Sequence, residues 1–226
     1  MPNNYIKDSE IDIYNIHVYG LSLKNREIYL HSCFDTEDES GVDYRSAVVF
    51  EKNIRYLNTI SIEPIVVHMH MPGGVWGDCM GIYDNIKLSK SKIIIVGYGS
   101  VESASSVILQ AGDLRILAPN TNVLIHYGSI SVDNEHKAAL SWVQWSEKES
   151  QKMIDIFTEK YCNSEIAREK KIKKYIAKKH IVSQLSNKCD WIMTAQEAVN
   201  YNFADGVLGS KKYPSIDSLK EAIKKK

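Results

Sequence analysis

Strands and helices alternate through the middle of this sequence, and this alternation restricts the fold more than any other feature. The run KIIIVGY (92–98) is apolar, as expected for a strand that is buried on both faces of a sheet. Apolar residues at helical spacing precede it over 77–88, and a second helix is expected over 103–111. Strands that alternate with helices in this way predict an α/β fold, in which helices cover a mainly parallel sheet.

The flanking segments extend the same pattern, and a chain of 226 residues is long enough to bury one substantial core. The further expected elements are strands at 26–31, 63–70, 114–118 and 122–128, and helices at 44–57, 137–161, 165–182, 195–201 and from Ile216. A capping box formed by Thr194 and Glu197 opens the helix at 195–201. The polar residues 1–15 are expected to be flexible, and the lysine-rich residues 211–226 are expected to form a basic tail.

A serine lies where a buried strand runs into a helix, in the segment GYGSVESASSVILQAG (97–112). The first N–H groups of a helix have no partner within it, so they can stabilise the oxyanion that forms during acyl transfer. A second donor is expected at Gly73-Gly74, because glycine lets a substrate carbonyl approach the backbone. On spacing alone, any serine of the segment is a candidate nucleophile, and a serine beside a helix start is also a common N-cap. These serines are Ser100, Ser103, Ser105 and Ser106.

A nucleophilic serine needs a base, and the base needs an acid that orients it. His126 stands at the end of the expected strand NVLIH, and Asp190 precedes the segment WIMTAQEA. These two residues are the candidate partners of the serine. Residue types alone do not separate a hydrolase from an unrelated α/β protein at this point.

Several short motifs stand in a definite order along the chain. They are Pro72-Gly73-Gly74, Ile82-Tyr83-Asp84, Ser103-Ala104-Ser105-Ser106, Ala111-Gly112, Pro119-Asn120, Ile125-His126, and Asp190 followed by Thr194-Ala195 and Glu197-Ala198. In this order they resemble the proteolytic subunit of the Clp protease family, ClpP. The similarity has no gap from Pro72 to Gly112, and it is clear again over 188–208.

The resemblance implies a role for each residue that matches a motif of the family. Ser103 would be the nucleophile, His126 the general base, and Asp190 the acid that orients the base. Gly74 and Ala104 would supply the two backbone N–H groups of the oxyanion hole. The chain would then be a serine endopeptidase that acts on peptides and unfolded polypeptides.

The resemblance also implies an architecture and an assembly. The fold would be the repeated β-β-α spiral that ClpP shares with the crotonases, with a peptidase domain over 16–210 and a helical handle at about 137–182. Subunits of the family form rings, so we expect a homo-oligomeric ring of about seven subunits. An AAA+ unfoldase would feed substrate to the ring, and any ATP use would belong to that partner, because this chain has no P-loop motif. No cofactor and no metal are expected.

The sequence departs from the family pattern at several positions. Ala104 and Ser105 stand where the family usually has Met-Gly, and Glu102 stands where it prefers a small neutral residue. The strand after the histidine, which is glycine-rich in the family, has one glycine here, Gly128. The arginine that precedes the acid in the family is Cys189 here. Because both of these last features help two rings to clasp, we expect ring pairing to be weak or to use the long helices instead.

Two alternative functions stay open at this stage. A ring subunit that has kept the fold and lost its activity would fit the altered residues around Ser103. A crotonase-type acyl-CoA enzyme would share the spiral fold and the paired N–H groups of the oxyanion hole. The presence of all three triad residues favours the peptidase, because the crotonases do not need a triad.

Other features of the sequence favour no additional ligand. His68 and His70 lie on one face of an expected strand, which gives half a metal site without a third ligand nearby. The basic run REKKIKKYIAKKH (168–180) fits a solvated helix face better than a surface for nucleic acid. Neither a membrane-spanning run nor a signal peptide is evident, and four scattered cysteines indicate reduced thiols. We therefore expect a cytoplasmic protein that binds neither nucleic acid nor membranes.

Overall fold

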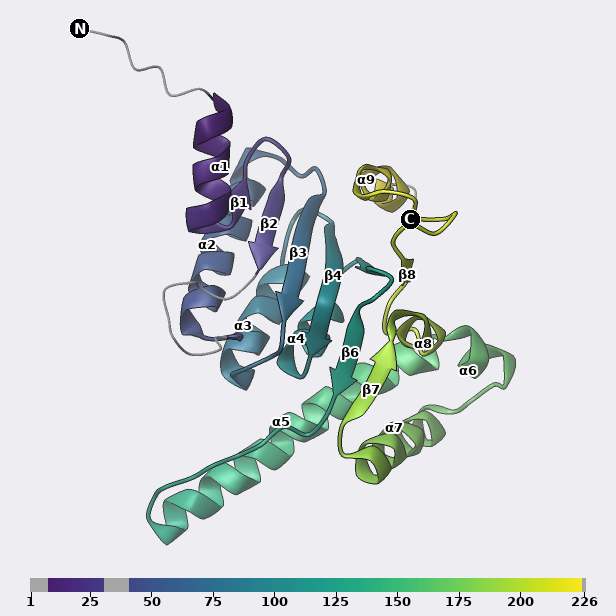
Figure 1. The fold of residues 1–226 in the computed structure, drawn as a ribbon. Helices are drawn as coiled ribbons and strands as arrows, with labels where there is room; N and C mark the ends of the chain where they lie inside the picture. The colour runs from purple at the N-terminus through teal and green to yellow at the C-terminus, as the bar shows by residue number, and fades with distance from the viewer. Residues whose placement is uncertain (1–7, 31–40, 225–226) are drawn as a thin grey trace, which may run out of the picture.

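The computed structural model describes residues 8–30 and 41–224, and a mainly parallel sheet forms its centre (Figure 1). In that part of the chain the strands are β1 (Leu21–Ser22), β2 (Glu27–Leu30), β3 (Ile65–Met71), β4 (Ile93–Glu102), β5 (Leu114–Leu117), β6 (Asn122–Ile125), β7 (Trp191–Thr194) and β8 (Gly206–Val207). The sheet follows the order β1-β2-β3-β4-β5-β8, while β6 pairs with β4 and β7 pairs with β6. The pairs β1–β2 and β6–β7 are antiparallel, and the others are parallel.

Strand β4 has ten residues and pairs with two different strands along one of its edges. Its residues 94–97 pair with β5, and its residues 100–102 pair with β6. Both pairs are parallel, so the carboxyl ends of β4 and β6 point in the same direction. The residues that follow β4 and β6 therefore come close together at one end of the sheet.

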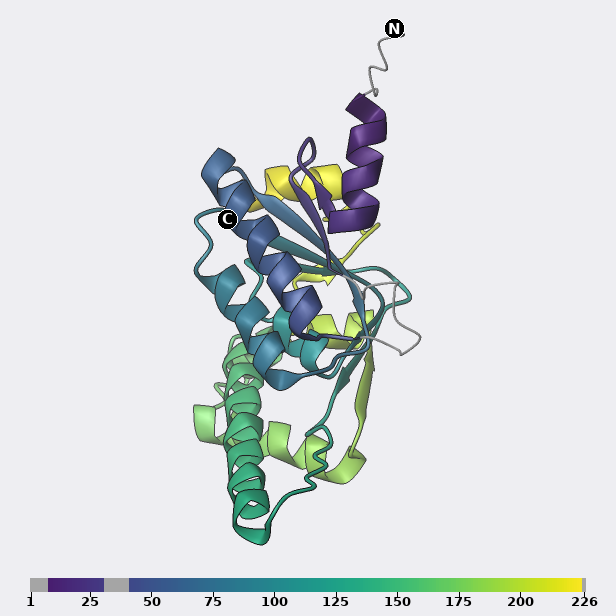
Figure 2. The ribbon, with the colours of Figure 1, turned by 90° about the vertical axis from the view of Figure 1, so that its left-hand side faces the viewer.

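Helices lie against both faces of this sheet (Figure 2). One face is covered by α2 (Tyr44–Ile60), α3 (Trp76–Lys87) and α4 (Ala104–Leu109), and the opposite face by α9 (Ile216–Lys224). Successive residues of a strand point to opposite faces, so Ile95 of β4 joins the larger core while Ile94 joins the core under α9. The strand is apolar throughout its first half because both of its faces are covered, as the sequence predicts.

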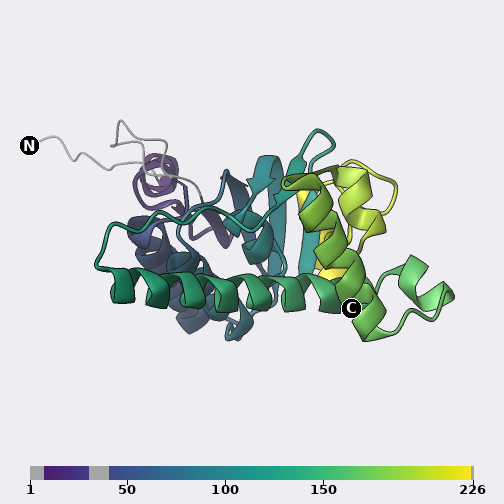
Figure 3. The same ribbon diagram turned by 90° about the horizontal axis from the view of Figure 1, so that it is seen from below.

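A long helix, α5 (His136–Cys162), runs beyond the sheet, and α7 (Lys174–Lys188) packs beside it (Figures 1 and 3). Phe157 and Tyr161 in the last turns of α5 are buried in the main core. Trp142 and Trp145, in its outer half, are 55% and 52% exposed. The chain then returns to the sheet through β7 and α8 (Ala195–Asn200), whose capping box of Thr194 and Glu197 is present as predicted.

The N-terminal segment differs from the flexible stretch predicted over 1–15. Residues from Asp8 form a helix, α1 (Asp8–Tyr19), while residues 1–7 lie outside the described part. Contacts with distant residues hold this helix, because the Ser22 hydroxyl donates to Asp12 and the Asn53 side chain donates to the Tyr19 carbonyl. Such tertiary contacts override the weak helical pattern of a polar segment.

The handle also differs from its prediction, because the single helix expected over 165–182 is two helices. The first is α6 (Glu165–Glu169), and α7 begins at Lys174. Between them Lys171 has a φ of 50°, and the N–H groups of Lys171 and Ile172 donate to the carbonyls of Arg168 and Ala167. This is a Schellman ending, and it lets Ile172 pack against the core.

Candidate active site

Ser103 occupies the sharp turn between β4 and α4. Its backbone has φ 53° and ψ −123°, a conformation that residues other than glycine rarely adopt. The Ser103 N–H donates to the Leu124 carbonyl of β6 at 2.9 Å, which fixes the turn against the neighbouring strand. Strain of this kind costs about 1–3 kcal/mol and persists where the surrounding structure holds it. The turn therefore presents the Ser103 side chain at the carboxyl end of the sheet.

The Ser103 hydroxyl lies 2.8 Å from Nε2 of His126. Ser103 is the N-cap residue of α4 by position, but its hydroxyl makes no capping hydrogen bond to that helix within the described structure. His126 directly follows β6, and the parallel pairing of β6 with β4 places the two residues side by side. The strand predicted over 122–128 ends at Ile125, which leaves His126 on the following loop.

Asp190 contacts the His126 ring at the nitrogen that does not face Ser103. Its Oδ1 lies 3.1 Å from Nδ1 of the imidazole, and the two side chains are 60% and 29% exposed, respectively. Asp190 precedes β7, which pairs antiparallel with β6 so that Trp191 lies opposite Ile125. The structure thus brings Ser103, His126 and Asp190 into one row.

A tight turn precedes the carboxylate. Cys189 has φ 57° and ψ −64°, and the Asp190 N–H donates to the Lys188 carbonyl at 2.7 Å. This three-residue turn connects α7 directly to β7 and directs the Asp190 side chain toward the imidazole. Cys189 itself is exposed. It is the residue that stands in place of the arginine expected from the resemblance.

The Gly73-Gly74 turn lies directly beside the serine. A Cβ at Gly73 would stand 2.6 Å from the Ser103 Cβ and 3.1 Å from the Ala104 nitrogen. On the other side, Val42 and Gly74 form a parallel β-bridge, in which the Val75 N–H donates to the Val42 carbonyl at 2.7 Å. Both glycines have positive φ, 107° and 148°, which suits glycine alone.

One predicted oxyanion donor, Gly74, belongs to this turn, and the other, Ala104, lies beside it. Neither the Gly74 N–H nor the Ala104 N–H has a backbone acceptor among the described residues. Ala104 is the first residue of α4, where an N–H has no partner inside the helix. Acyl transfer needs two such donors around one serine, and here Ala104 follows Ser103 while Gly74 follows Gly73, which lies against Ser103.

The other candidate serines lie elsewhere. Ser105 and Ser106 are fully buried, and the Ser106 hydroxyl donates to the Ser103 carbonyl at 2.6 Å. Ser100 lies within β4, opposite Asn122. Within the described structure, the hydroxyl that meets His126 is that of Ser103.

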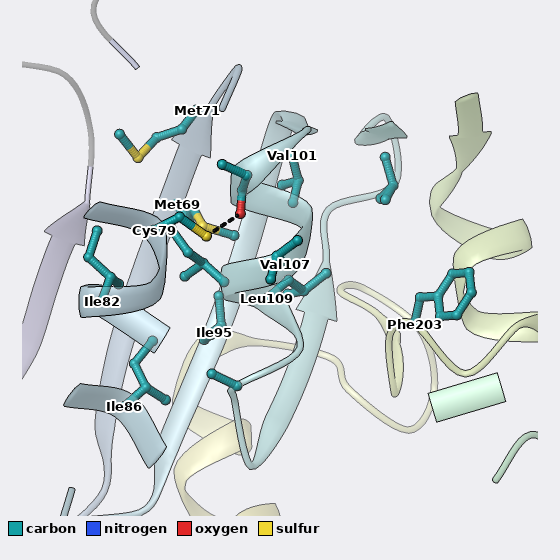
Figure 4. Close-up of a cluster of buried hydrophobic side chains, with 14 of the residues drawn as sticks. Met69, Met71, Cys79, Ile82, Ile86, Ile95, Val101, Val107, Leu109 and Phe203 are labelled. Carbon is teal, nitrogen blue, oxygen red and sulfur yellow. Dashed lines mark hydrogen bonds between the residues drawn. The ribbon is translucent and has the colours of Figure 1, made fainter. Parts of the chain in front are cut away.

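Cys79 of α3 makes a hydrogen bond to the first residue of α4, which Figure 4 draws as a dashed line. Its thiol is fully buried and donates to the Ala104 carbonyl at 3.2 Å. Burial raises the pKa of Cys79 to about 12, so the thiol stays protonated and keeps its donor. The sequence did not point to this residue, because a cysteine on a helix has an ordinary packing role in most proteins.

Of the two histidines of β3, His68 contacts polar side chains of the neighbouring strands β2 and β4. His68 Nδ1 lies 3.0 Å from the Tyr98 hydroxyl, and its Nε2 lies 3.5 Å from Glu27. Burial raises the pKa of Glu27, but hydrogen bonds from His68 and Tyr29 outweigh it and hold the pKa below its usual value. No group of three metal-binding side chains occurs among residues 8–30 and 41–224.

The basic run 168–180 is divided between α6 and α7, and most of its lysines are exposed. Within residues 8–30 and 41–224, every helix is too short or too polar to cross a lipid bilayer.

The chain is similar to proteolytic subunits of Clp proteases along most of its length. The family model for Clp protease matches residues 12–211. Subunit 2 of the ATP-dependent Clp protease of Mycobacterium leprae is 27% identical over 214 residues, which are 92% of this chain and 89% of that protein. The ATP-dependent Clp protease proteolytic subunit of Carsonella ruddii is 27% identical over 113 residues, which are 49% of this chain and 54% of that protein.

A solved structure has the same fold. A mutant of ClpP1 from Listeria monocytogenes superimposes with a TM-score of 0.67 at 19% identity, over 84% of this chain and 95% of that chain. The predicted mixed α/β fold of the ClpP type is confirmed by this match. Since the family model extends over nearly the whole chain and the fold agrees with it, this chain belongs to the Clp protease family.

Proposed function

We propose that this chain is a serine endopeptidase that cleaves peptides and unfolded polypeptides through an acyl-enzyme. The observation that carries the proposal is the continuous row of hydrogen bonds from Ser103 through His126 to Asp190, at 2.8 Å and 3.1 Å. Family membership supports it, because the chain is a Clp protease family subunit. Ala104 directly follows Ser103, and Gly74 directly follows Gly73, which lies against Ser103, so these two residues can supply the N–H donors that the reaction needs.

The geometry gives each residue a step in the reaction. His126 Nε2 accepts the proton of Ser103 as its oxygen attacks the substrate carbonyl, and the imidazolium then gives that proton to the leaving amine. Asp190 holds the Nδ1–H tautomer and stabilises the imidazolium that forms. The N–H groups of Gly74 and Ala104 stabilise the oxyanion of the tetrahedral intermediate. Water, deprotonated by the same imidazole, then hydrolyses the acyl-enzyme and regenerates the Ser103 hydroxyl.

The subunit works inside a homo-oligomeric ring of about seven copies in this proposal, with an AAA+ unfoldase that supplies substrate in the cytoplasm. The long helix α5 supports an assembly role, because Trp142 and Trp145 would otherwise stay exposed to water. Ring pairing through this helix replaces the glycine-rich clasp, since residues 127–135 form no strand in this chain.

A fluorophosphonate probe tests the proposal directly, because it labels a serine only when base and oxyanion hole activate it. We expect one labelled residue, Ser103, and no labelling of a Ser103→Ala variant that keeps its fold. Ser100→Ala is the matched control, because it removes a nearby hydroxyl from the same strand and should leave labelling unchanged. Absence of labelling in the wild-type ring would favour an inactive subunit or a crotonase-type enzyme, and labelling at another serine would refute the assignment of Ser103.

A further inference from the structure

One peptide unit connects the nucleophile to the proposed oxyanion hole. Its carbonyl belongs to Ser103, and its N–H is the proposed donor of Ala104. The Ser103 carbonyl accepts two hydrogen bonds from one residue, because the Ser106 N–H lies 3.0 Å away and the Ser106 hydroxyl lies 2.6 Å away. Hydrogen bonds to a carbonyl polarise the whole amide, so they strengthen the N–H on its other side as a donor.

The Ser106 hydroxyl is well placed to keep this bond during catalysis. Ser106 is fully buried, so water does not compete for the carbonyl. The next turn of α4 is anchored as well, because the Gln110 amide donates to the Ser106 carbonyl at 3.0 Å and to the Phe203 carbonyl at 3.1 Å. The guanidinium of Arg115 in turn donates to the Gln110 side chain at 3.0 Å. This buried chain of hydrogen bonds leaves Ser106 little freedom to turn away.

We propose that Ser106 is a positioning residue for the hydrolytic reaction, which acts through the Ser103–Ala104 peptide to strengthen the Ala104 N–H as an oxyanion donor. The inference rests on the proposed function, because it needs an oxyanion beside Ser103. It adds a role for a side chain that touches neither the substrate nor the imidazole. It also explains why two hydrogen bonds converge on one carbonyl at a turn that is already held by the Leu124 carbonyl.

The expected effect is modest and falls on the chemical step. Loss of a whole oxyanion-hole donor costs about 10²–10³-fold in kcat, and one hydrogen bond polarises its neighbour by roughly 10–30%. Removal of the Ser106 hydroxyl should therefore lower kcat by roughly two- to eight-fold. KM should stay nearly constant, because the polarised N–H matters most when the negative charge develops.

A purely structural role for Ser106 would look different. Serine hydroxyls often bond to a carbonyl of the preceding turn without any effect on chemistry. Ser146 in α5 gives this chain its own example, because its hydroxyl donates to the Val143 carbonyl at 2.8 Å on an exposed surface. Ser146→Ala is therefore the matched control for Ser106→Ala, with the same spacing in the helix and no connection to the site.

The first test is steady-state hydrolysis of a peptide substrate by the assembled protein. We expect Ser106→Ala to lower kcat at unchanged KM, Ser106→Thr to restore most of the loss through its hydroxyl, and Ser146→Ala to match the wild type. If Ser106→Ala does not fold, Ser106→Cys keeps a donor at this position that is larger and weaker, and it should show the same change to a smaller extent. Wild-type kcat in a folded variant that lacks the hydroxyl would overturn the inference.

The second test reads the oxyanion hole by infrared spectroscopy of a slowly hydrolysed acyl-enzyme. The acyl carbonyl accepts hydrogen bonds in the hole, so a weaker donor raises its stretching frequency. We expect a higher frequency in Ser106→Ala than in the wild type. Cys79→Ala is the comparison, because it removes a hydrogen bond from the next carbonyl, whose peptide carries the N–H of Ser105.

The outcomes separate this inference from the proposed function. An unchanged frequency in Ser106→Ala, or an equal shift in Cys79→Ala, overturns the role of Ser106 and leaves the peptidase proposal in place. If the wild-type protein hydrolyses a substrate without forming an acyl-enzyme, both the role of Ser106 and the proposed serine-peptidase mechanism are overturned.

Discussion

The hydroxyl of Ser103 lies 2.8 Å from Nε2 of His126, and the parallel pairing of β4 with β6 sets this distance. The two residues are 23 positions apart, and each follows the last residue of its strand. Two parallel strands end at the same edge of a sheet, so the residues that follow them lie close together, and the strained turn at Ser103 then directs its hydroxyl toward the imidazole. The nucleophile and its base are therefore positioned by backbone hydrogen bonds of the core.

Asp190→Asn should keep the fold and lower turnover by several orders of magnitude, up to about 10⁴-fold, because the amide favours the wrong tautomer of His126. The Asp190 side chain is 60% exposed, so its replacement costs little stability. Asp155→Asn is the control, since it removes an exposed carboxylate paired with Lys178 at 2.7 Å. Peptide hydrolysis by both variants is the measurement. Turnover near the wild-type value in Asp190→Asn would show that another group, or none, orients the imidazole.

Gly73→Ala should abolish hydrolysis, because the new Cβ would stand 2.6 Å from the Ser103 Cβ and 2.8 Å from the Glu102 carbonyl oxygen. The turn would have to move, and with it the nucleophile. Gly77→Ala in α3 is the control, because a Cβ there meets nothing within 4 Å. It should stabilise the protein by about 0.5–1 kcal/mol. Hydrolysis and thermal unfolding of both variants test the prediction, which an active Gly73→Ala protein would contradict.

His180 should make the stability of the handle depend on pH. Its ring stacks on Tyr161 and Tyr201, with centroids 5.0 Å and 5.9 Å apart. Burial, with nearby Lys188, lowers the pKa of His180 below 6.5. The unfolded chain then binds more protons than the folded one, so the free energy of unfolding falls as pH drops through about 6.5.

His180→Phe should flatten this pH dependence, because phenylalanine keeps an aromatic ring in the stack and does not titrate. Urea unfolding at about pH 7.5 and about pH 5.5 is the measurement. The wild type should lose more stability between the two values than the variant does. An equal loss in both proteins would mean that other groups cause the acid sensitivity.

Substitution of exposed tryptophans on α5 should separate two levels of assembly. We expect a ring of about seven subunits whose pairing into a double ring depends on this helix. Trp142→Glu with Trp145→Glu should leave single rings, because two charges would replace apolar surface at the contact. Light scattering at micromolar concentration measures both states, with Tyr175→Glu, at another exposed aromatic residue on α7, as the control. A stable wild-type monomer would exclude the ring, and double rings in the tryptophan variant would exclude the helix as the contact.

The sequence predicted the elements whose signals are local. The apolar run of β4, the breaker at Gly73-Gly74 and the capping box at Thr194 each follow from neighbouring residues, and each is present. The helix at Asp8–Tyr19 and the ending at Lys171 were missed. Both depend on contacts or backbone angles that a hydrophobic pattern does not report.

The sequence could identify the residues of the candidate site, but it could not predict the strand pairing and the contacts that bring them together. Strand β7 was not expected, although its pairing with β6 is what carries Asp190 to His126. The roles of Cys79 and Ser106 were not expected either, because a buried cysteine and a serine in a helix have ordinary packing roles in most sequences. Only the distances to the Ala104 and Ser103 carbonyls distinguish them.

Strand β7, which brings Asp190 to the site by pairing with β6, is synthesised well after β6. The site is therefore completed late in the synthesis of the chain. Asp190 follows His126 by 64 residues, and all of α5, α6 and α7 lie between them. At ribosomal rates this separates the arrival of base and acid by roughly 3–13 s. During that interval the nascent chain holds Ser103 and His126 without the carboxylate, so a growing subunit gains its full hydrolytic machinery only after the handle has left the ribosome.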